Sequence, residues 1–317
     1  MTLPPSLTRR DAILALAAGL AGCNRALGGR PRVAFVLKTF NSPFFLDMRH
    51  GAEAATARTG IDLVVQAAER EIDVERQMQI IENLIETRLA VLCICPSGSK
   101  AIVPAVGKAN RAGIHVIIVD DEIDDRAAAE QGVSFDAYVG SDNVEGGRIA
   151  GQYLVDASRG SARLALLKGI PGHQTGDARL RGFRDAIRSA PGIAVVASQT
   201  ANWERDQGFT VFRNMLQAHP EIDALFACND MMALGAVEAI QAAGQTGRIR
   251  TIGFDAVDDA RKAIAAGRMA ASVAQYPEEM GRIAVESAAL LIRGERVPRD
   301  QRTKVGLVTR ANLDAPR

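Results

Sequence analysis

Short runs of mostly apolar residues, rich in β-branched side chains, recur along the chain from residue 32 onward. The first four runs occupy residues 33–37, 62–65, 90–94 and 115–119. Between them lie longer stretches with helical spacing, at residues 44–58, 74–87 and 101–112. Near-continuous apolar strands bounded by helices are typical of a parallel sheet that is covered on both faces. The pattern therefore predicts an α/β fold.

The alternation of strands and helices begins again after residue 141. Four further apolar runs occupy residues 162–167, 193–197, 224–227 and 251–253. The length of 317 residues also corresponds to about two domains of about 150 residues each. We therefore predict two doubly wound parallel-sheet lobes rather than one long sheet.

Composition narrows the class of protein without identifying its function. Hydrophobic residues make up 47% of the chain and charged residues 24%, which is ordinary for a folded globular protein and excludes a disordered chain. The 38 Lys and Arg residues balance 37 Asp and Glu residues, so the basic surplus of a nucleic-acid-binding protein is missing. Cys93 and Cys95 are expected to be buried free thiols. No residue pattern predicts a cofactor, and none has the spacing of a zinc site.

The first 23 residues have the features of an export signal. Arg9 and Arg10 precede an apolar run at 12–20. An α-helix rises about 1.5 Å per residue, so a helix formed by this run would be too short to cross a hydrocarbon core of about 30 Å. Residues 20–23 (LAGC) resemble a lipobox, which implies acylation of Cys23 and anchoring to the membrane. Residues 24–31 are expected to be a flexible tether. Residues 8–14 also resemble a twin-arginine motif, so both export routes stay open.

Polar and aromatic residues directly follow many of the predicted strands. In parallel α/β sheets, ligands bind beyond the carboxyl ends of the strands. The residues at these positions include Lys38, Asn41, Ser42, Phe44, Phe45, Asp120, Asp121, Asn229, Asp255 and Gln275. A mixture of carboxylates, amides and aromatic rings is not typical of a hydrolase or of a phosphate site.

Four segments resemble the motifs of periplasmic sugar-binding proteins of the ribose-binding class. They are residues 38–45 (KTFNSPFF), 141–147 (SDNVEGG), 229–235 (NDMMALG) and 273–275 (VAQ). The resemblance extends from about residue 32 to the C-terminus, and within the class it is strongest to the allose-binding members. It implies the type I periplasmic binding protein fold, in which a hinge with three chain crossings joins the lobes.

The same resemblance implies the boundaries of the two lobes. The crossings are expected near Ser141, Tyr276 and Lys304. The N-terminal lobe would then comprise residues 32–141 and 276–304. The C-terminal lobe would comprise residues 142–275 and 305–317.

The resemblance also implies roles for individual residues. Phe44 and Phe45 would stack on one apolar face of a sugar ring and Trp203 on the other, because sugar C–H faces suit aromatic rings. Polar side chains would bind the hydroxyl rim: Lys38, Ser42, Asp120, Asp121, Arg179, Asn229, Asp255 and Gln275. Asp230 is expected to cap the helix beside Asn229.

Other roles stay open for several of these residues. Asp121 could cap the following segment, Trp203 could anchor a loop, and Arg179 could form a surface salt bridge. His173 lies in the same region and could approach the ligand. Ser42 and Cys95 replace asparagines of the ribose binders, and Asp121 replaces an arginine. These differences disfavour ribose as the ligand.

By resemblance, the protein is an extracytoplasmic substrate-binding protein that delivers a monosaccharide, expected to be an aldohexose such as allose, to an ABC transporter permease. It would act as a monomer in the periplasm or at the outer face of the cytoplasmic membrane. The alternative is a sensor that presents its closed form to a chemoreceptor or sensor kinase. A transcription regulator would need a helix-turn-helix where the export signal is predicted. An enzyme using Asp120 and Asp255 is disfavoured because Lys38 and Arg179 should keep both ionised.

Cys23→Ser is expected to release the protein from the membrane fraction, because serine cannot carry the thioether-linked lipid. Fractionation of cells that express either form, followed by detection of the protein in soluble and membrane fractions, measures this. If Cys23→Ser stayed with the membranes, the lipobox interpretation would be wrong.

Overall fold

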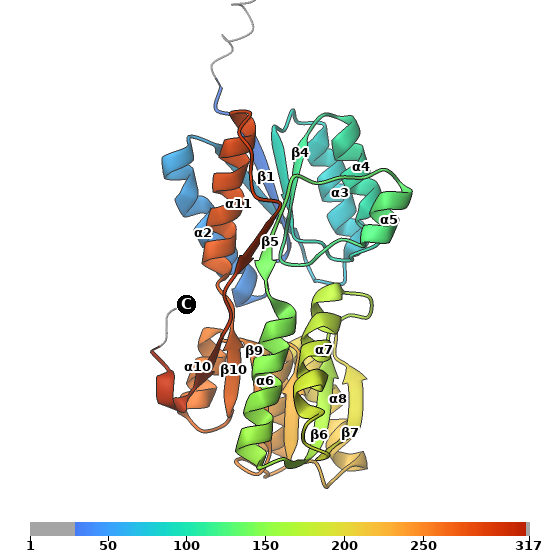
Figure 1. Cartoon of the computed structure of the whole chain (residues 1–317), viewed down its shortest axis with the longest axis vertical. Helices are drawn as coiled ribbons and strands as arrows, with labels where there is room; N and C mark the ends of the chain where they lie inside the picture. The colour runs from blue at the N-terminus through green and yellow to red at the C-terminus, as the bar shows by residue number, and fades with distance from the viewer. Residues whose placement is uncertain (1–28, 315–317) are drawn as a thin grey trace, which may run out of the picture.

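The computed structural model describes residues 29–314, which form two α/β lobes, one above the other in Figure 1. The export signal, Cys23 and most of the tether lie outside the described residues. Among the helices of residues 29–314, none is both long enough and apolar enough to cross a membrane.

The first lobe combines one sheet with five helices. Its strands are β1 (Arg32–Thr39), β2 (Asp62–Ala68), β3 (Val91–Ile94), β4 (His115–Val119), β5 (Ala137–Ser141) and β11 (Asp300–Thr303). Its helices are α2 (Pro43–Thr59), α3 (Val74–Ile85), α4 (Val103–Arg111), α5 (Asp125–Glu130) and α11 (Pro277–Ile292). The sheet has the strand order β11-β5-β4-β3-β1-β2, and its strands are parallel.

The second lobe repeats this arrangement. Its strands are β6 (Ser161–Lys168), β7 (Gly192–Thr200), β8 (Ala224–Ala227), β9 (Arg250–Asp255), β10 (Ala271–Ala274) and β12 (Gly306–Thr309). Its helices are α6 (Asn143–Ser158), α7 (Gln174–Ile187), α8 (Arg205–Ala218), α9 (Asp230–Ala242), α10 (Asp258–Ala265) and the short 3₁₀ helix η2 (Arg310–Asn312). The strand order is β12-β10-β9-β8-β6-β7, with only β10 and β12 antiparallel.

The chain passes between the two sheets three times. The passages lie between β5 and α6, between β10 and α11, and between β11 and β12. In Figure 1, β5 leads down to α6 at the boundary of the lobes. The predicted fold class, two doubly wound parallel-sheet lobes, is confirmed.

Each lobe has its own hydrophobic core. In the first lobe, α2 and α11 cover one face of the sheet and α3 and α4 the other, so buried side chains of β1, β3 and β4 alternate between two clusters. In the second lobe a single large cluster surrounds the sheet, and the rings of Phe183 and Phe226 stack within it at 4.2 Å. Because the cores are separate, the lobes can move as two bodies.

Two glycines allow α2 and α11 to touch backbone to backbone. A Cβ added to Gly51 would lie 1.9 Å from the carbonyl oxygen of Glu278, and one added to Gly281 would lie 2.0 Å from that of Met48. Such distances are far below van der Waals contact. The close approach fixes the position of α2, whose first turn carries two of the predicted site residues.

Gly51→Ala is expected to lower the free energy of unfolding by about 1–3 kcal/mol, the usual cost of overpacking a buried contact. Urea unfolding followed by circular dichroism measures this. Ala54→Val is the control, because it adds carbon atoms on the exposed side of the same helix and should cost only about 0.6 kcal/mol. Equal losses in both variants would contradict the close helix contact.

Candidate functional site

A cavity lies between the lobes. Both lobes contribute to its wall. The first lobe provides Lys38, Ser42, Phe44, Phe45, Glu71 and Asp120, and the second provides Thr175, Arg179, Trp203, Asn229, Asp255 and Gln275.

The ends of strands and the starts of helices position most of these side chains. In the first lobe Lys38 lies near the end of β1, and Phe44 and Phe45 lie in the first turn of α2. In the second lobe Asn229 follows β8 and Asp255 ends β9. Residues at the carboxyl ends of parallel strands meet at one edge of a sheet, and the two sheets present these edges to the same cavity.

Lys38 is held between two carboxylates. Its Nζ lies 3.2 Å from Oδ2 of Asp120 and 3.0 Å from Oδ2 of Asp121, and all three side chains are buried. Burial opposes the charged ammonium, but the charges of Asp121 and Asp120 outweigh it and raise the pKa of Lys38. The ammonium therefore stays charged beside the cavity at all physiological pH values.

Arg179 is the second buried cation of the site. Its Nε donates to Oδ1 of Asn143 at 2.8 Å, and its Nη1 donates to the carbonyl oxygen of Cys228 at 2.6 Å. The guanidinium carbon lies 3.8 Å from the centre of the Phe254 ring. Because Arg179 is only 3% exposed, the alternative of a surface salt bridge is wrong.

Asp255 is held by Arg179 and Gln275. Its Oδ1 lies 3.6 Å from Nη1 of Arg179 and accepts a hydrogen bond from Nε2 of Gln275 at 2.6 Å. Burial raises the pKa of Asp255 to about 6, against the opposing effects of Arg179 and Gln275. The carboxyl group is therefore mostly ionised at neutral pH and acts as a hydrogen-bond acceptor.

Each lobe contributes an aromatic surface to the cavity. The rings of Phe44 and Phe45 are 5.2 Å apart and nearly perpendicular, at 85°. From the other lobe, the indole Nε1 of Trp203 donates to Nδ1 of His173 at 3.2 Å. A Cβ on Gly169 would lie 1.9 Å from the Trp203 ring, so only glycine leaves room for the indole there.

The structure gathers ten of the eleven residues for which a ligand contact was predicted. Ten of them line the cavity: Lys38, Ser42, Phe44, Phe45, Asp120, Arg179, Trp203, Asn229, Asp255 and Gln275. Asp121 is fully buried and does not appear on the cavity wall. Its carboxylate instead joins Lys38 to Thr175 and His173 of the second lobe.

Two cavity residues were missed by the sequence analysis. Thr175 lies in the first turn of α7, four positions before Arg179 and therefore on the same helix face. Glu71 follows β2, at a strand end like the other site residues, but it stands among Glu69, Arg70 and Asp73 and resembles a solvated charged turn.

Glu71 is an unpaired acid in the cavity. It is 8% exposed, and within residues 29–314 it makes no hydrogen bond or salt bridge. Burial raises the pKa of Glu71 to about 8, with Lys38 opposing this and Asp120 and Asp255 adding to it. Its carboxyl group lacks a protein partner, and so does the buried Oε1 of Gln275 on the same wall.

The helix cap at the start of α9 differs from the prediction. Oδ1 of Asn229 accepts from the backbone N–H of Met232 at 2.9 Å, so Asn229 is the cap, and its Nδ2 donates to the carbonyl oxygen of Trp203 at 3.1 Å. Asp230 instead accepts from Ser272 and from the backbone of Val257. The prediction that Asp230 caps the helix is wrong because its carboxylate points into the core of the second lobe.

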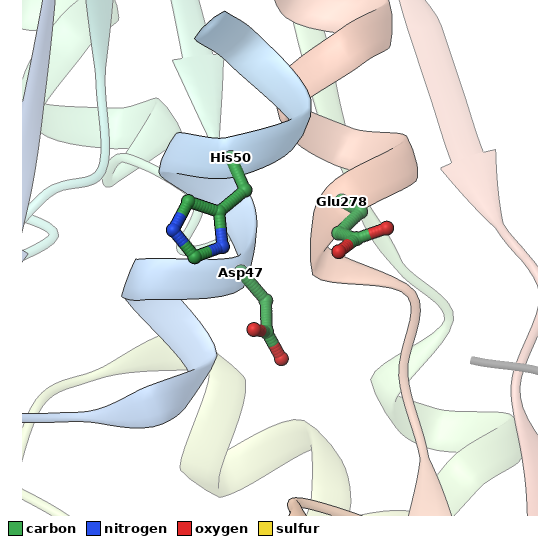
Figure 2. Close-up of side chains that lie close together, drawn as sticks. All are labelled: Asp47, His50 and Glu278. Carbon is green, nitrogen blue, oxygen red and sulfur yellow. The ribbon is translucent and has the colours of Figure 1, made fainter. Parts of the chain in front are cut away.

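A second group of titratable side chains lies outside the cavity, where α2 meets α11. Figure 2 shows Asp47 and His50 on α2 and Glu278 on α11. One potential ligand atom from each lies within 4.8 Å of the others, and His50 and Glu278 are exposed. The sequence predicted no metal site, and we assign no ion to this group because its side chains are largely solvated.

Comparison with known proteins gives one family for nearly the whole chain. Residues 33–296 match the periplasmic binding protein domain family. The chain is 34% identical to the D-ribose/D-allose-binding protein of Pseudomonas aeruginosa over 288 residues, which cover 88% of this chain and 89% of that protein. It is 37% identical to the ribose import binding protein RbsB of Escherichia coli over 265 residues, 84% of this chain and 86% of that protein.

A solved structure agrees with these relatives. An ABC transporter periplasmic solute binding protein from Actinobacillus succinogenes, determined with bound D-allose, superposes with a TM-score of 0.84. The two chains are 35% identical, and the superposition covers 90% of this chain and 99% of the other.

Glu71→Gln is expected to change how stability depends on pH. An acid whose pKa is about 8 in the folded protein and about 4.3 in the unfolded chain takes up a proton on folding between these values. The free energy of unfolding of the wild-type protein should therefore fall as pH rises through this window. Glutamine cannot ionise, so the variant should lack this part of the decline.

Urea unfolding of both ligand-free proteins, measured from about pH 4.5 to pH 9, tests the effect. The variant should gain stability relative to the wild type as pH rises, with a slope of at most about 1.4 kcal/mol per pH unit. Asp255 titrates in both proteins, so its effect largely cancels in the difference. A difference that is independent of pH would contradict an unpaired Glu71 carboxyl.

Proposed function

The chain belongs to the periplasmic binding protein family, and from this we propose that it is the sugar-binding protein of an ABC-type importer, with an aldohexose such as allose as its ligand. The observation that carries the proposal is the cavity between the lobes, whose wall combines an aromatic surface from each lobe with planar charged and amide groups. The named functions of the relatives, binding and import of ribose or allose, support it.

The chemistry of the wall suits a neutral ring with many hydroxyl groups. Ionised carboxylates only accept hydrogen bonds and the cations only donate, whereas each hydroxyl can do both. A hydroxyl between Asp255 and Arg179, for example, can donate to one and accept from the other. The two aromatic surfaces can cover the apolar C–H faces of the same ring.

The polar contacts account for specificity. A hydrogen bond to a charged group contributes about 1.5–3 kcal/mol, and a buried partner left unpaired costs a similar amount. A sugar that lacks one matching hydroxyl therefore loses about tenfold or more in affinity, whereas stacking discriminates weakly. We add Glu71 to the predicted ligand-binding residues. Its carboxyl group has no hydrogen-bond partner in the protein, and a ligand hydroxyl can be that partner.

Of the three differences from the ribose binders, only Ser42 lies on the cavity wall. Cys95 is fully buried and its Sγ lies 3.5 Å from Sδ of Met48, so its difference from the ribose binders does not alter the cavity wall. Ser42 does line the cavity, and Lys38 brings an ammonium to it. These two residues support a hexose over ribose.

The remaining parts of the proposal concern how the protein acts. The ligand closes the lobes because only the closed state brings both aromatic surfaces onto it. The permease then recognises the closed shape and takes the sugar unchanged, and the protein acts as a monomer anchored through Cys23. We do not propose catalysis, because ion pairs and hydrogen bonds hold the wall carboxylates of Asp120 and Asp255 in place. Glu71 is the exception.

Isothermal titration calorimetry with D-allose, other aldohexoses, D-ribose and inositols tests the proposal. We expect at least one aldohexose to bind with a Kd of about 1 μM or less, which corresponds to about −8 kcal/mol, and to change the fluorescence of Trp203. Asp120→Ala should weaken this binding at least about tenfold. Asp185→Ala, on the exposed side of α7, is the control. Absence of binding to every monosaccharide and polyol, or chemical conversion of the sugar, would contradict the proposal.

A further inference from the structure

The segment 173–175, at the start of α7 in the second lobe, contacts the first lobe beside the cavity. We propose that this segment and Asp121 form a latch that stabilises the closed state by the same amount whichever sugar is bound. The inference deepens the proposed function and rests on it for the identity of the ligand. The latch itself consists only of protein atoms.

The strongest contact of the latch is between Thr175 and Asp121. Oδ1 of Asp121 accepts from Oγ1 of Thr175 at 2.6 Å and from its backbone N–H at 3.1 Å. Asp121 is fully buried, and its Oδ2 is bound by Lys38 within its own lobe. Oδ1 therefore obtains its protein partners from the other lobe.

His173 contributes a second contact across the lobes. Its Nε2 lies 2.9 Å from the carbonyl oxygen of Ser97, and because a carbonyl only accepts, this nitrogen carries the proton. Its Nδ1 accepts from Trp203 and lies 3.2 Å from Oδ2 of Asp121. The ring thus links the aromatic surface of the second lobe to the loop that follows β3 in the first.

Gln174 adds contacts farther from the cavity. Its Nε2 donates to the carbonyl oxygen of Ile123 at 3.1 Å, and its backbone N–H donates to Oγ of Ser99 at 3.4 Å. The three consecutive residues 173–175 therefore bind the loops that follow both β3 and β4. All of these bonds are lost when the lobes separate.

The charge of Asp121 makes the latch favourable. Burial opposes its ionised form, but Lys38 and the hydrogen bond from Thr175 lower the pKa of Asp121 below its usual value. Hydrogen bonds to an ionised group are about twice as strong as neutral ones. When the lobes open, Oδ1 must exchange these bonds for water.

Asp121 does not line the cavity. Thr175 does, but its hydroxyl and its backbone N–H both donate to Asp121, so the latch acts on closure and not on ligand choice. If the ligand binds firmly only to the closed state, the apparent Kd equals the intrinsic Kd divided by the fraction of protein that is closed. A change in the latch therefore multiplies the Kd of every ligand by one factor. A residue that touches the ligand changes the Kd values of different sugars unequally.

Thr175→Val removes the hydroxyl donor with little change of shape and leaves Lys38 and Asp120 in place. The first measurement needs no ligand. Spin labels are attached to Glu75→Cys in α3 and to Asn214→Cys in α8, both at exposed positions, and the distance between the labels is measured. Electron paramagnetic resonance of the ligand-free protein should show fewer closed molecules in the variant, with the ratio of closed to open reduced up to about tenfold. Thr175→Ser should restore the wild-type distribution.

Thr200→Val is the matched control, since its hydroxyl donates to the carbonyl oxygen of Gly169 at 2.6 Å within the second lobe. It should leave the distribution of distances unchanged. An unchanged distribution in Thr175→Val, or an equal change in Thr200→Val, would overturn the latch even if no sugar is known to bind.

The second measurement compares the affinities of two sugars that bind the wild-type protein. Thr175→Val should raise both Kd values by the same factor, up to about tenfold, and leave their ratio unchanged. A changed ratio would overturn the latch and make Thr175 a ligand-contacting residue. If the wild-type protein binds no sugar, the proposed function is wrong. The distances between the spin labels still test the latch, because they are measured without ligand.

Discussion

The buried ion cluster of Lys38 with Asp120 and Asp121 is the interaction on which the site depends. Lys38 comes from β1 and the two acids follow β4, while β3 lies between these strands in the sheet. One ammonium cannot fully compensate two buried carboxylates, and breaking such a cluster leaves an uncompensated buried charge. Asp121 satisfies its remaining oxygen with donors from the second lobe, and Asp120 turns toward the cavity. The ion cluster therefore serves both the cavity and the contact between the lobes.

The excess of acids explains why a hydroxyl-rich neutral ligand fits this cavity. Carboxylates on or behind its wall belong to Asp120, Asp121 and Asp255, whereas its cations are Lys38 and Arg179. Glu71, whose pKa is about 8, is mostly protonated at neutral pH and adds little charge. An anion would face repulsion from these acids. A polyhydroxylated ring supplies hydrogen-bond donors to the acids without adding charge, and the same hydroxyl groups accept from the two cations.

Sequence patterns were sufficient for the fold and for most of the cavity wall, because both follow from short-range rules. Apolar runs alternating with helices specify parallel sheets, and the carboxyl ends of the strands then identify residues such as Lys38 and Asn229. The distinction between Asp120 and Asp121 was not accessible in this way. Both follow β4, and their separate roles depend on the positive φ of 67° at Asp120 and on the position of the second lobe. Glu71 was missed because Glu69, Arg70 and Asp73 make its surroundings in the sequence resemble a solvated turn, whereas the folded chain buries its side chain.

The cavity and the contact between the lobes are parts of one arrangement. His173 links the indole of Trp203 to Ser97 of the first lobe, so the interactions that close the lobes also orient one aromatic surface. Asn229 supports the same loop by donating to the carbonyl oxygen of Trp203. In an open form Trp203 would lose this connection to the first lobe, and Phe44 and Phe45 would no longer face it. The complete binding site therefore exists only in the closed state.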